Sequence, residues 1–176
     1  STQVANAIEI YNLDGVNVDI ENVGHEFREH YTLLVQRLRQ KIPAHKEISV
    51  AVASNPKGWT TGLHGSYDYT QLAKYSDYLV IMAYDEHWEG GSPGAVASTN
   101  FVEQSIIYAV NRAPAQKIVL AMPFFGRIWG GNGVMNGKGV TLKRAEQLRL
   151  DYGGQVDYDS ASDASVMTFT VNAGDK

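Results

Sequence analysis

Asp19 and Glu21 are two carboxylates separated by one residue, in a stretch over residues 13–21 that alternates apolar and polar side chains. This period of two predicts a β-strand with Val16, Val18 and Ile20 on one face and Asn17, Asp19 and Glu21 on the other. Three polar side chains are costly to bury unless they bond one another or a ligand, so we expect the polar face to line a pocket.

The acidic pair has a plain chemical use. Crowding and burial can hold one carboxyl group protonated while its neighbour stays ionised. That combination suits glycoside cleavage, in which one acid protonates the leaving oxygen and a neighbour stabilises the cationic transition state. The alternative is an acidic strand end that caps the next helix or binds a stray cation.

Segments typical of strands and helices alternate along most of the chain. Strands are predicted over 13–21, 48–54, 77–85 and 117–125, and helices over 1–10, 24–41, 68–74 and 99–112. Such βα repeats predict a parallel sheet. Polar residues follow the predicted strands at their C-terminal ends, where a barrel enzyme carries its site: Asp19, Glu21, Asn55, Tyr84, Asp85 and Arg127.

The composition changes after Arg127. Residues 130–139 are rich in glycine, a helix capped by Thr141 is predicted over 141–150, and a strand over 166–171. We therefore expect one domain over residues 1–129 and the beginning of a second, smaller one over 130–176.

Composition excludes several classes of function. A net charge of −4 argues against a nucleic-acid surface. The absence of cysteine excludes disulfides, thiolate metal sites and cysteine nucleophiles. No apolar run is long enough to predict a membrane span. The H-E-F-R-E-H run at 25–30 does not fit the zinc motif, and the glycines around Lys138 do not fit a phosphate-binding loop. No metal or cofactor is therefore expected.

Two strings carry a family resemblance. Residues 14–21, Asp-Gly-Val-Asn-Val-Asp-Ile-Glu, resemble the D-G-x-D-x-D-x-E signature of glycoside hydrolase family 18, the chitinase-like family. Residues 82–85, Met-Ala-Tyr-Asp, are similar to that family's M-x-Y-D motif, and 49–53 and 120–126 resemble two further barrel strands. Residues 84–88 with Ser-Pro-Gly at 92–94 resemble the bacterial spore-envelope branch, whose members cut peptidoglycan.

The resemblance implies a (β/α)8 TIM barrel. A complete barrel usually needs about 250 residues, so a chain of 176 residues is expected to be a piece of one, with about four βα units. The first strands and the last one would be missing, and residues 130–176 would begin a small α+β insertion. Exposed sheet edges in such a fragment would favour self-association and little turnover.

The resemblance also implies a mechanism, in which the substrate's own 2-acetamido oxygen attacks the anomeric carbon with net retention. By match, Glu21 is the general acid and then the base, Asp19 orients the acetamido N–H, and Tyr84 donates its hydroxyl to the acetamido carbonyl. Asn17 stands where the family pattern has an aspartate, and it is expected to leave Asp19 more firmly ionised.

Further residues are expected to bind an N-acetylglucosamine polymer, the partner that the resemblance implies. Aromatic side chains bind sugar faces, and Trp59, Trp88 and Trp129 all fall in loops or at strand ends. The expected binding residues are Asn17, Asn55, Asp85, Trp88, Arg127 and Trp129.

Four readings stay open at this point. The first is an N-acetylglucosaminidase acting on peptidoglycan, with an extracellular or spore- or cell-envelope location. The second is a chitinase or an N-glycan endoglycosidase of the same mechanism. The third is a non-catalytic sugar-binding lectin, which the presence of Glu21 disfavours because such relatives usually lack this glutamate. The fourth is an unrelated βα enzyme that uses Asp19 and Glu21 to bind Mg²⁺.

Overall fold

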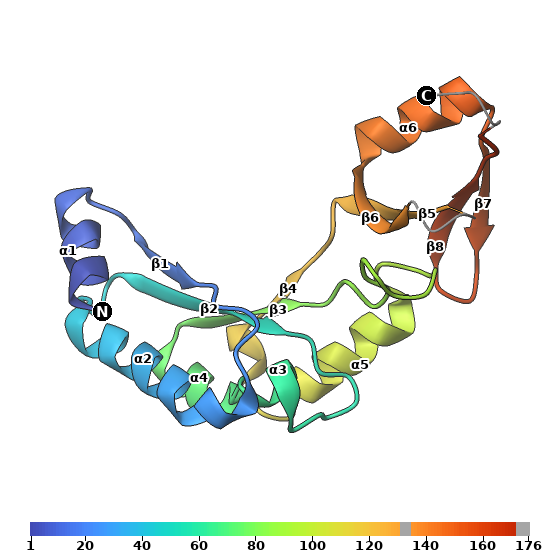
Figure 1. The fold of residues 1–176 in the computed structure, drawn as a ribbon. Helices are drawn as coiled ribbons and strands as arrows, with labels where there is room; N and C mark the ends of the chain where they lie inside the picture. Colours follow the sequence, from blue (N-terminus) through green and yellow to red (C-terminus); the bar gives the residue numbers. More distant parts are fainter. Residues whose placement is uncertain (131–134, 172–176) are drawn as a thin grey trace. The chain divides into compact units, whose positions relative to one another are not determined.

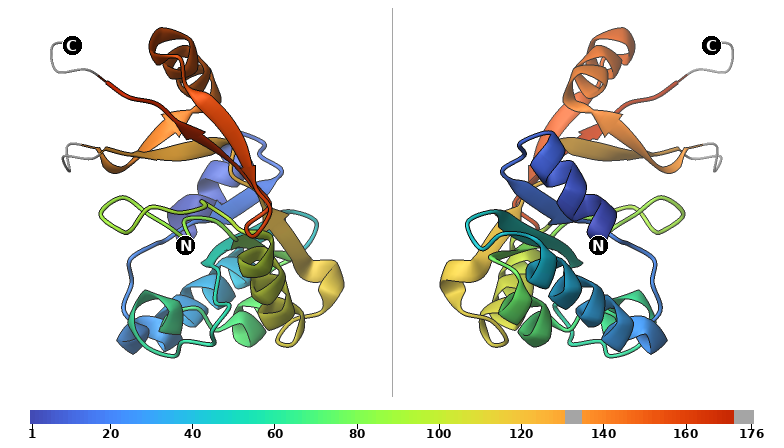
Figure 2. Two further views of the ribbon diagram at one scale, coloured as in Figure 1. Left: turned by 90° about the vertical axis from the view of Figure 1, so that its right-hand side faces the viewer. Right: turned by 90° about the vertical axis from the view of Figure 1, so that its left-hand side faces the viewer.

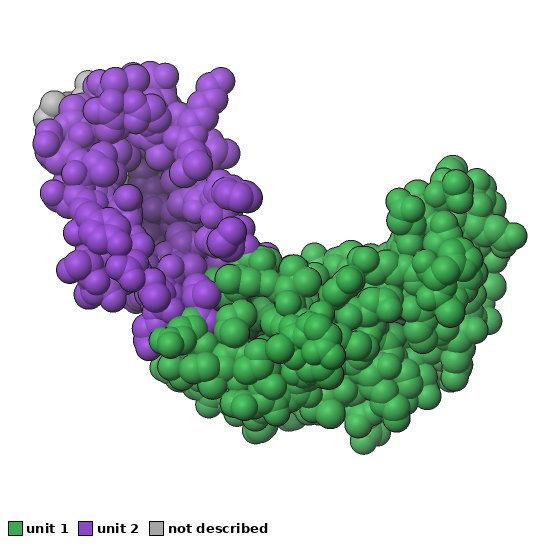
Figure 3. Space-filling view, turned by 180° about the vertical axis from the view of Figure 1, so that it is seen from behind, with its two compact units in different colours: residues 1–83, 103–121 green, residues 84–102, 122–176 purple. Residues whose placement is uncertain are grey.

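The computed structural model describes residues 1–130 and 135–171. The chain forms two compact units: unit 1 comprises residues 1–83 and 103–121, and unit 2 comprises residues 84–102 and 122–176 (Figure 3). The boundary that we predicted after residue 129 stays a prediction.

Unit 1 is built on a four-stranded parallel sheet (Figure 1). The strands are β1 (Gly15–Val18), β2 (Glu47–Ala53), β3 (Tyr78–Met82) and β4 (Ile118–Ala121), and they lie in chain order. This confirms the predicted α/β class with a parallel sheet, the arrangement of a partial (β/α)8 barrel. Because all four strands run in one direction, their C-terminal ends meet at one edge of the sheet.

Helices α1 (Thr2–Ile10), α2 (Arg28–Lys41), α3 (Gly62–Gly65) and α4 (Tyr69–Tyr75) complete most of unit 1. A 3-10 turn, η1 (His25–Phe27), leads into α2, and η2 (Ala115–Lys117) leads into β4. Helices α2 and α4 lie side by side on one face of the sheet (Figures 1 and 2). Helix α5 (Thr99–Val110) begins in unit 2 and ends in unit 1.

The core of unit 1 lies between the sheet and these helices. Its fully buried side chains come from strands and helices alike: Val35, Ile48, Val50, Val52, Leu72, Leu79 and Ile81. Each contributes roughly 1.5–3 kcal/mol of hydrophobic stabilisation. The buried strand predicted from the near-continuous apolar run is confirmed, because residues 48–52 of the central strand β2 are all buried.

The predicted buried strand over 117–125 is wrong. Strand β4 ends at Ala121, and Phe125 begins another strand. Val119 and Leu120 are 41% and 37% exposed, because β4 is the edge of the described sheet. The helix predicted over 24–41 begins later, at Arg28, because residues 25–27 form a 3-10 turn in which Phe27 is 50% exposed. Strands β1 and β3 are also shorter than the predicted 13–21 and 77–85.

Besides residues 84–102, the described part of unit 2 contains two hairpins and helix α6. Strands β5 (Phe125–Trp129) and β6 (Asn136–Thr141) pair antiparallel, as do β7 (Gln155–Asp159) and β8 (Ala164–Thr168). Helix α6 (Leu142–Tyr152) lies between them in sequence. The predicted cap is confirmed, since the Thr141 hydroxyl accepts the Arg144 N–H at 3.1 Å. Within residues 1–130 and 135–171, no helix is long and apolar enough to cross a membrane.

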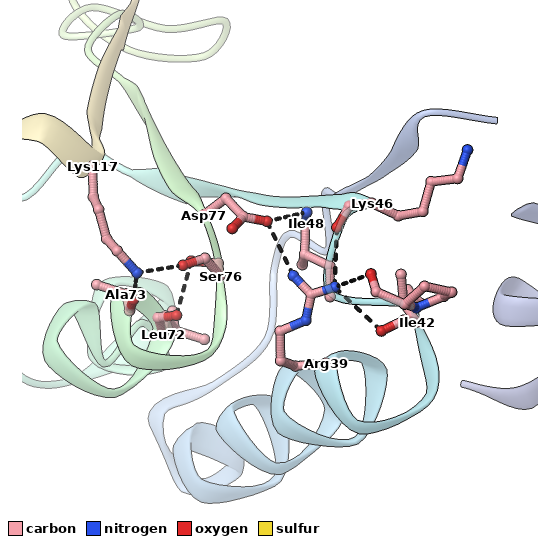
Figure 4. A network of polar contacts seen from close by, with 10 residues as sticks. Arg39, Ile42, Lys46, Ile48, Leu72, Ala73, Ser76, Asp77 and Lys117 are labelled. Atoms are coloured by element: carbon pink, nitrogen blue, oxygen red, sulfur yellow. Dashed lines mark hydrogen bonds and ion pairs between the residues drawn. The ribbon is translucent and has the colours of Figure 1, made fainter.

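A polar network joins the N-terminal end of the sheet to helices α2 and α4 (Figure 4). One guanidinium nitrogen of Arg39 donates to the carbonyls of Ile42, Pro43 and Lys46 at 3.3, 2.9 and 3.0 Å. The other pairs with Asp77 at 3.1 Å, and the same carboxylate oxygen accepts the Ile48 N–H at 2.8 Å. Lys117 donates to the Ala73 and Ser76 carbonyls, both at 2.7 Å, at the end of α4.

We expect Arg39→Lys to destabilise unit 1 by about 2 kcal/mol, because an ammonium group cannot span the carbonyls and the carboxylate that the planar guanidinium joins. Urea unfolding followed by circular dichroism measures the change. Arg37→Lys, on the exposed face of the same helix, is the matched control. Equal stabilities for the two variants would contradict the assigned role of Arg39.

Candidate active site

The acidic pair lies just beyond the end of β1. The strand ladder stops at the pair Val18 and Val50, and Val18 is buried. Asp19 and Glu21 are exposed, on either side of Ile20. Asn22 follows with a φ of 57°, a left-handed conformation that asparagine tolerates well. The chain therefore leaves the sheet and turns at once, which presents both carboxylates at the C-terminal edge.

The glycine of the signature, Gly15, is required for steric reasons. A Cβ atom added at Gly15 would overlap the backbone of Glu47 on the neighbouring strand. Next to it, the Asp14 carbonyl accepts the Glu47 N–H at 2.9 Å, which begins the pairing of β1 with β2. Gly15 thus allows the close approach that sets the register of the strand carrying the acids.

Asn17, at the position where the family pattern has an aspartate, contacts the neighbouring strand. Its side-chain amide donates to the Ser49 hydroxyl at 2.9 Å, and Ser49 is buried. This bond holds the Asn17 side chain against β2. An aspartate at the same position would need the serine hydroxyl to donate instead.

Two buried tyrosines pack against each other, and one of them contacts the segment that carries the acidic pair. Tyr31 from α2 and Tyr67 from the segment before α4 are 4% and 2% exposed, and their ring centroids are 5.6 Å apart. The Tyr67 hydroxyl donates to the Ile20 carbonyl at 3.2 Å. The Tyr31 hydroxyl is buried and makes no hydrogen bond within the described part of the chain. Our sequence reasoning did not select Tyr67, which is distant from Ile20 along the chain.

Both tyrosines titrate well above the ordinary range. Burial raises the pKa of Tyr67 to about 12, and the charges of Glu21 and Asp19 add to the effect. Burial likewise raises the pKa of Tyr31, with contributions from Tyr67, Asp19 and Glu21. Because burial disfavours the charged phenolate, both phenols are neutral at physiological pH.

We expect this arrangement to weaken the fold at alkaline pH. A raised pKa in the folded state stabilises the fold fully below the unfolded value of 10.0, and the stabilisation is lost as the pH rises through about 12. For Tyr67 the loss is on the order of 2 kcal/mol, since each tenfold difference in proton affinity is worth about 1.4 kcal/mol. Urea unfolding between pH 9 and 12 measures it. Tyr67→Phe should flatten the pH dependence, and an unchanged slope in this variant would contradict the assignment.

Asn55, which follows β2, organises its own loop. It is 1% exposed, its amide donates to the Trp59 carbonyl at 2.8 Å, and its oxygen accepts the Trp59 N–H at 2.7 Å. Trp59 is 40% exposed, and the centroid of its ring lies 4.5 Å from that of the His64 ring. Asn55 therefore holds a partly exposed aromatic ring in place, and both of its side-chain polar atoms are used in doing so.

In unit 2, Asp85 is held by Arg127. The guanidinium forms two bonds to the carboxylate, at 2.9 and 2.7 Å, and a third to the Gly137 carbonyl at 2.7 Å. The Arg127 side chain is 12% exposed and that of Asp85 is 37% exposed. Asp85 has a φ of 58°, a conformation that few non-glycine residues adopt. The neighbouring Tyr84 ring meets Phe125 edge-on at 6.0 Å.

The loop over residues 86–98 is fastened to the hairpin of β5 and β6. The Gly90 N–H donates to the Asn136 carbonyl at 2.7 Å, and the Trp129 indole N–H donates to the Gly91 carbonyl at 3.0 Å. Gly137, with a φ of 79°, passes so close to the Trp88 carbonyl that a Cβ atom there would lie 2.6 Å from it. Trp88 itself is 58% exposed. The loop thus presents one open indole ring on a fixed backbone.

The structure brings the selected residues together in two groups. In unit 1, Asn17, Asp19 and Glu21 share the C-terminal end of one strand, and Asn55 follows the next. In unit 2, Asp85 contacts Arg127 of β5, and the loop that carries Trp88 is bonded to the same hairpin by the Gly90 N–H and by the Trp129 indole N–H. Among the described residues, no three His, Asp or Glu side chains gather as a metal site requires. The individual roles of these residues stay predictions.

Comparison with known proteins gives the family. The model of the family described as "Glycosyl hydrolases family 18" matches residues 1–170. The "Uncharacterized glycosylase YvbX" of Bacillus subtilis is 32% identical over 137 residues, which are 77% of this chain and 39% of that protein. The "Cortical fragment-lytic enzyme" of Bacillus anthracis is 28% identical over 170 residues, covering 93% of this chain and 39% of that enzyme.

The fold agrees with solved structures of the same kind. The crystal structure of a chitinase from Chromobacterium violaceum superposes with a TM-score of 0.85 and 28% identity, over 94% of this chain and 52% of that one. The chain spans about two fifths of the length of the curated relatives named above, at 39% of each. Together with the acidic strand end and the parallel sheet, these matches place the chain in glycosyl hydrolase family 18.

Proposed function

We propose that the protein carrying this chain is a retaining glycoside hydrolase that cleaves β-1,4 linkages after N-acetylglucosamine. The observation that carries the proposal is the pair Asp19 and Glu21, exposed at the C-terminal end of β1 in a chain that belongs to family 18. Glu21 is the general acid, and Asp19 is the neighbouring carboxylate that stabilises developing positive charge.

The proposed reaction has two steps. In the first, Glu21 protonates the glycosidic oxygen while the substrate's acetamido oxygen attacks the anomeric carbon, which breaks the glycosidic bond and leaves an oxazolinium ion. In the second, the ionised Glu21 takes a proton from water, and the water oxygen attacks the same carbon. The acetamido oxygen leaves, so the sugar product keeps its configuration.

The remaining residues position the sugar. Tyr84 donates its hydroxyl to the acetamido carbonyl, and Asp85 binds a sugar hydroxyl or the acetamide. Arg127 acts through Asp85, because its guanidinium is already bonded to that carboxylate. The open ring of Trp88 is the stacking surface for a sugar, whereas Trp129 fixes the loop that carries Trp88.

Peptidoglycan is the substrate that we favour, in the spore cortex or the cell wall, with the protein in the spore or cell envelope. A relative named for lysis of cortical fragments supports this choice, as its match extends over most of the chain. Chitin is the alternative, which the structural likeness to a chitinase supports. A lectin would bind the sugar polymer without hydrolysing it. The presence of Glu21 disfavours this alternative, because non-catalytic relatives usually lack that glutamate.

The test is mass spectrometry of muropeptides after incubation of purified spore peptidoglycan with the whole protein. New reducing ends at N-acetylglucosamine are the expected result. No new ends with retained binding would favour the lectin, and no ends with no binding would move the test to chitin oligomers. Turnover of chitin oligomers alone would keep the reaction and replace the substrate.

The 176-residue chain by itself is expected to self-associate and to turn over substrate poorly. Strands β1 and β4 are the edges of its described sheet, and Val119 and Leu120 on β4 are partly exposed. Unpaired edges with apolar side chains favour pairing between copies. Sedimentation velocity combined with an activity assay tests this. A monomer with robust hydrolysis would contradict it.

A further inference from the structure

The segment that carries the two acids has little support from the sheet. Strand pairing ends at Val18, so the backbone of Asp19, Ile20 and Glu21 lies past the ladder. The hydrogen bond that the structure gives this segment comes from a side chain, the Tyr67 hydroxyl, which donates to the Ile20 carbonyl at 3.2 Å. Ile20 is the residue between the acids, so this bond acts on the peptide that joins Ile20 to Glu21.

Tyr67 is itself held firmly. It is 2% exposed and packs against the ring of Tyr31. On one side, Arg28 of α2 donates to the Gly65 carbonyl at 2.9 Å. On the other, Arg28 pairs with Asp68 at 3.0 Å, and Asp68 caps α4 by accepting the Gln71 N–H at 3.0 Å. The residues that flank Tyr67 are thus bonded to α2, through the Gly65 carbonyl and the Asp68 carboxylate, and to the first turn of α4, through the Asp68 cap. These bonds give the hydroxyl a defined position.

The protonation state of Tyr67 suits a donor. Its pKa is raised to about 12 by burial and by the charges of Glu21 and Asp19, so the phenol keeps its proton at every pH at which the acids could act. Its hydrogen bond to the Ile20 carbonyl places the hydroxyl beside the residue that separates the two acids. A donor that is buried, neutral and fixed is suited to hold a carbonyl in one orientation.

We propose that Tyr67 is a positioning residue for the acidic pair, which holds the Ile20 peptide and thereby sets the directions of the Asp19 and Glu21 side chains. Successive side chains on an extended backbone are oriented by the peptides between them, so rotation of the Ile20 peptide would move both carboxyl groups. A shift of about 1 Å at a reacting group can cost about a hundredfold in rate. This inference rests on the proposed function.

Tyr69 provides a matched control. It is also a buried tyrosine, 1% exposed, and its hydroxyl also donates to a backbone carbonyl, that of Ala53 at 2.5 Å. Its bond is made at the end of β2 and does not involve the acidic segment. Tyr67→Phe and Tyr69→Phe therefore each delete one buried phenol-to-carbonyl bond, and only the first acts on the peptide between the acids.

The experiment measures kcat and KM of the whole protein and of both variants on an N-acetylglucosamine polymer. We expect Tyr67→Phe to lower kcat about ten- to a hundredfold with KM within about twofold, and Tyr69→Phe to keep kcat within about twofold. A kcat for Tyr67→Phe equal to that of Tyr69→Phe would overturn the inference.

A second readout does not depend on turnover. Carbon-13 NMR titrations of the Asp19 and Glu21 carboxyl groups, in all three proteins, report their surroundings directly. Shifted titration curves in Tyr67→Phe alone are expected, and identical curves would overturn the positioning role. Absence of hydrolysis by the unaltered protein would count against the proposed function only, and the NMR comparison would still decide the role of Tyr67.

Discussion

Glu21→Gln in the whole protein should lower kcat on peptidoglycan fragments by a factor of about a thousand or more. The amide keeps the size of the side chain and can still form hydrogen bonds, but it cannot give a proton to the leaving oxygen or take one from water. Because Glu21 serves in both steps of the proposed reaction, both slow together. Steady-state release of reducing ends from a defined muropeptide measures the loss.

Glu47→Gln is the matched control for this substitution. Glu47 is an exposed glutamate that begins β2, so it lies at the opposite end of the sheet from Glu21. It should keep kcat unchanged, and substrate binding by Glu21→Gln should persist. Hydrolysis by Glu21→Gln at the rate of the unaltered protein would remove Glu21 as the acid. The search would then turn to the other two carboxylates that are proposed to act on the substrate, Asp19 and Asp85.

Arg127→Lys should destabilise unit 2 by about 2 kcal/mol and lower kcat about tenfold. The guanidinium makes three bonds, two to Asp85 and one to the Gly137 carbonyl, and a lysine cannot reproduce the planar fork. Asp85 stands in a left-handed conformation beside Tyr84, so its release would disturb the residue that is proposed to orient the acetamido group. Thermal unfolding and steady-state kinetics measure the two effects.

Arg149→Lys serves as the control for the arginine chemistry. Arg149 also makes two bonds to one carboxylate, that of Glu146, both at 2.8 Å, but on the exposed surface of α6. An exposed ion pair of this kind contributes little, so no measurable change is expected. If Arg127→Lys also changed neither the stability nor kcat, Arg127 would not be the residue that holds Asp85 in place.

Local patterns in the sequence were sufficient for the class of fold. A continuous apolar run predicted the central strand β2, and a threonine before a helical stretch predicted the cap of α6. The order of strands and helices predicted a parallel sheet with the acids at its C-terminal edge. These features depend on residues close together in the chain, since burial on both faces and helix capping leave local signatures.

Other parts of the fold left no such signature. The sequence pattern merged β4 with the start of β5, because both segments are apolar and the break between them depends on a change of pairing partner. The hairpin of β5 and β6 and the strand β7 were not predicted at all. Edge strands and short hairpins expose much of their surface, so their residues show weaker alternation than strands in a core.

The sequence by itself determined the family, the acidic pair and the order of the βα units, because a signature string and hydrophobic periods are local properties. Only the tertiary structure decided what the other selected residues contact. Asn55 is bonded to its own loop, Arg127 to Asp85, and the Ile20 peptide to Tyr67, which is 47 residues away in the chain. Such partners are chosen by the packing of α2 and α4 on the sheet and by the pairing of the hairpin, and neither is encoded in the neighbours of any one residue.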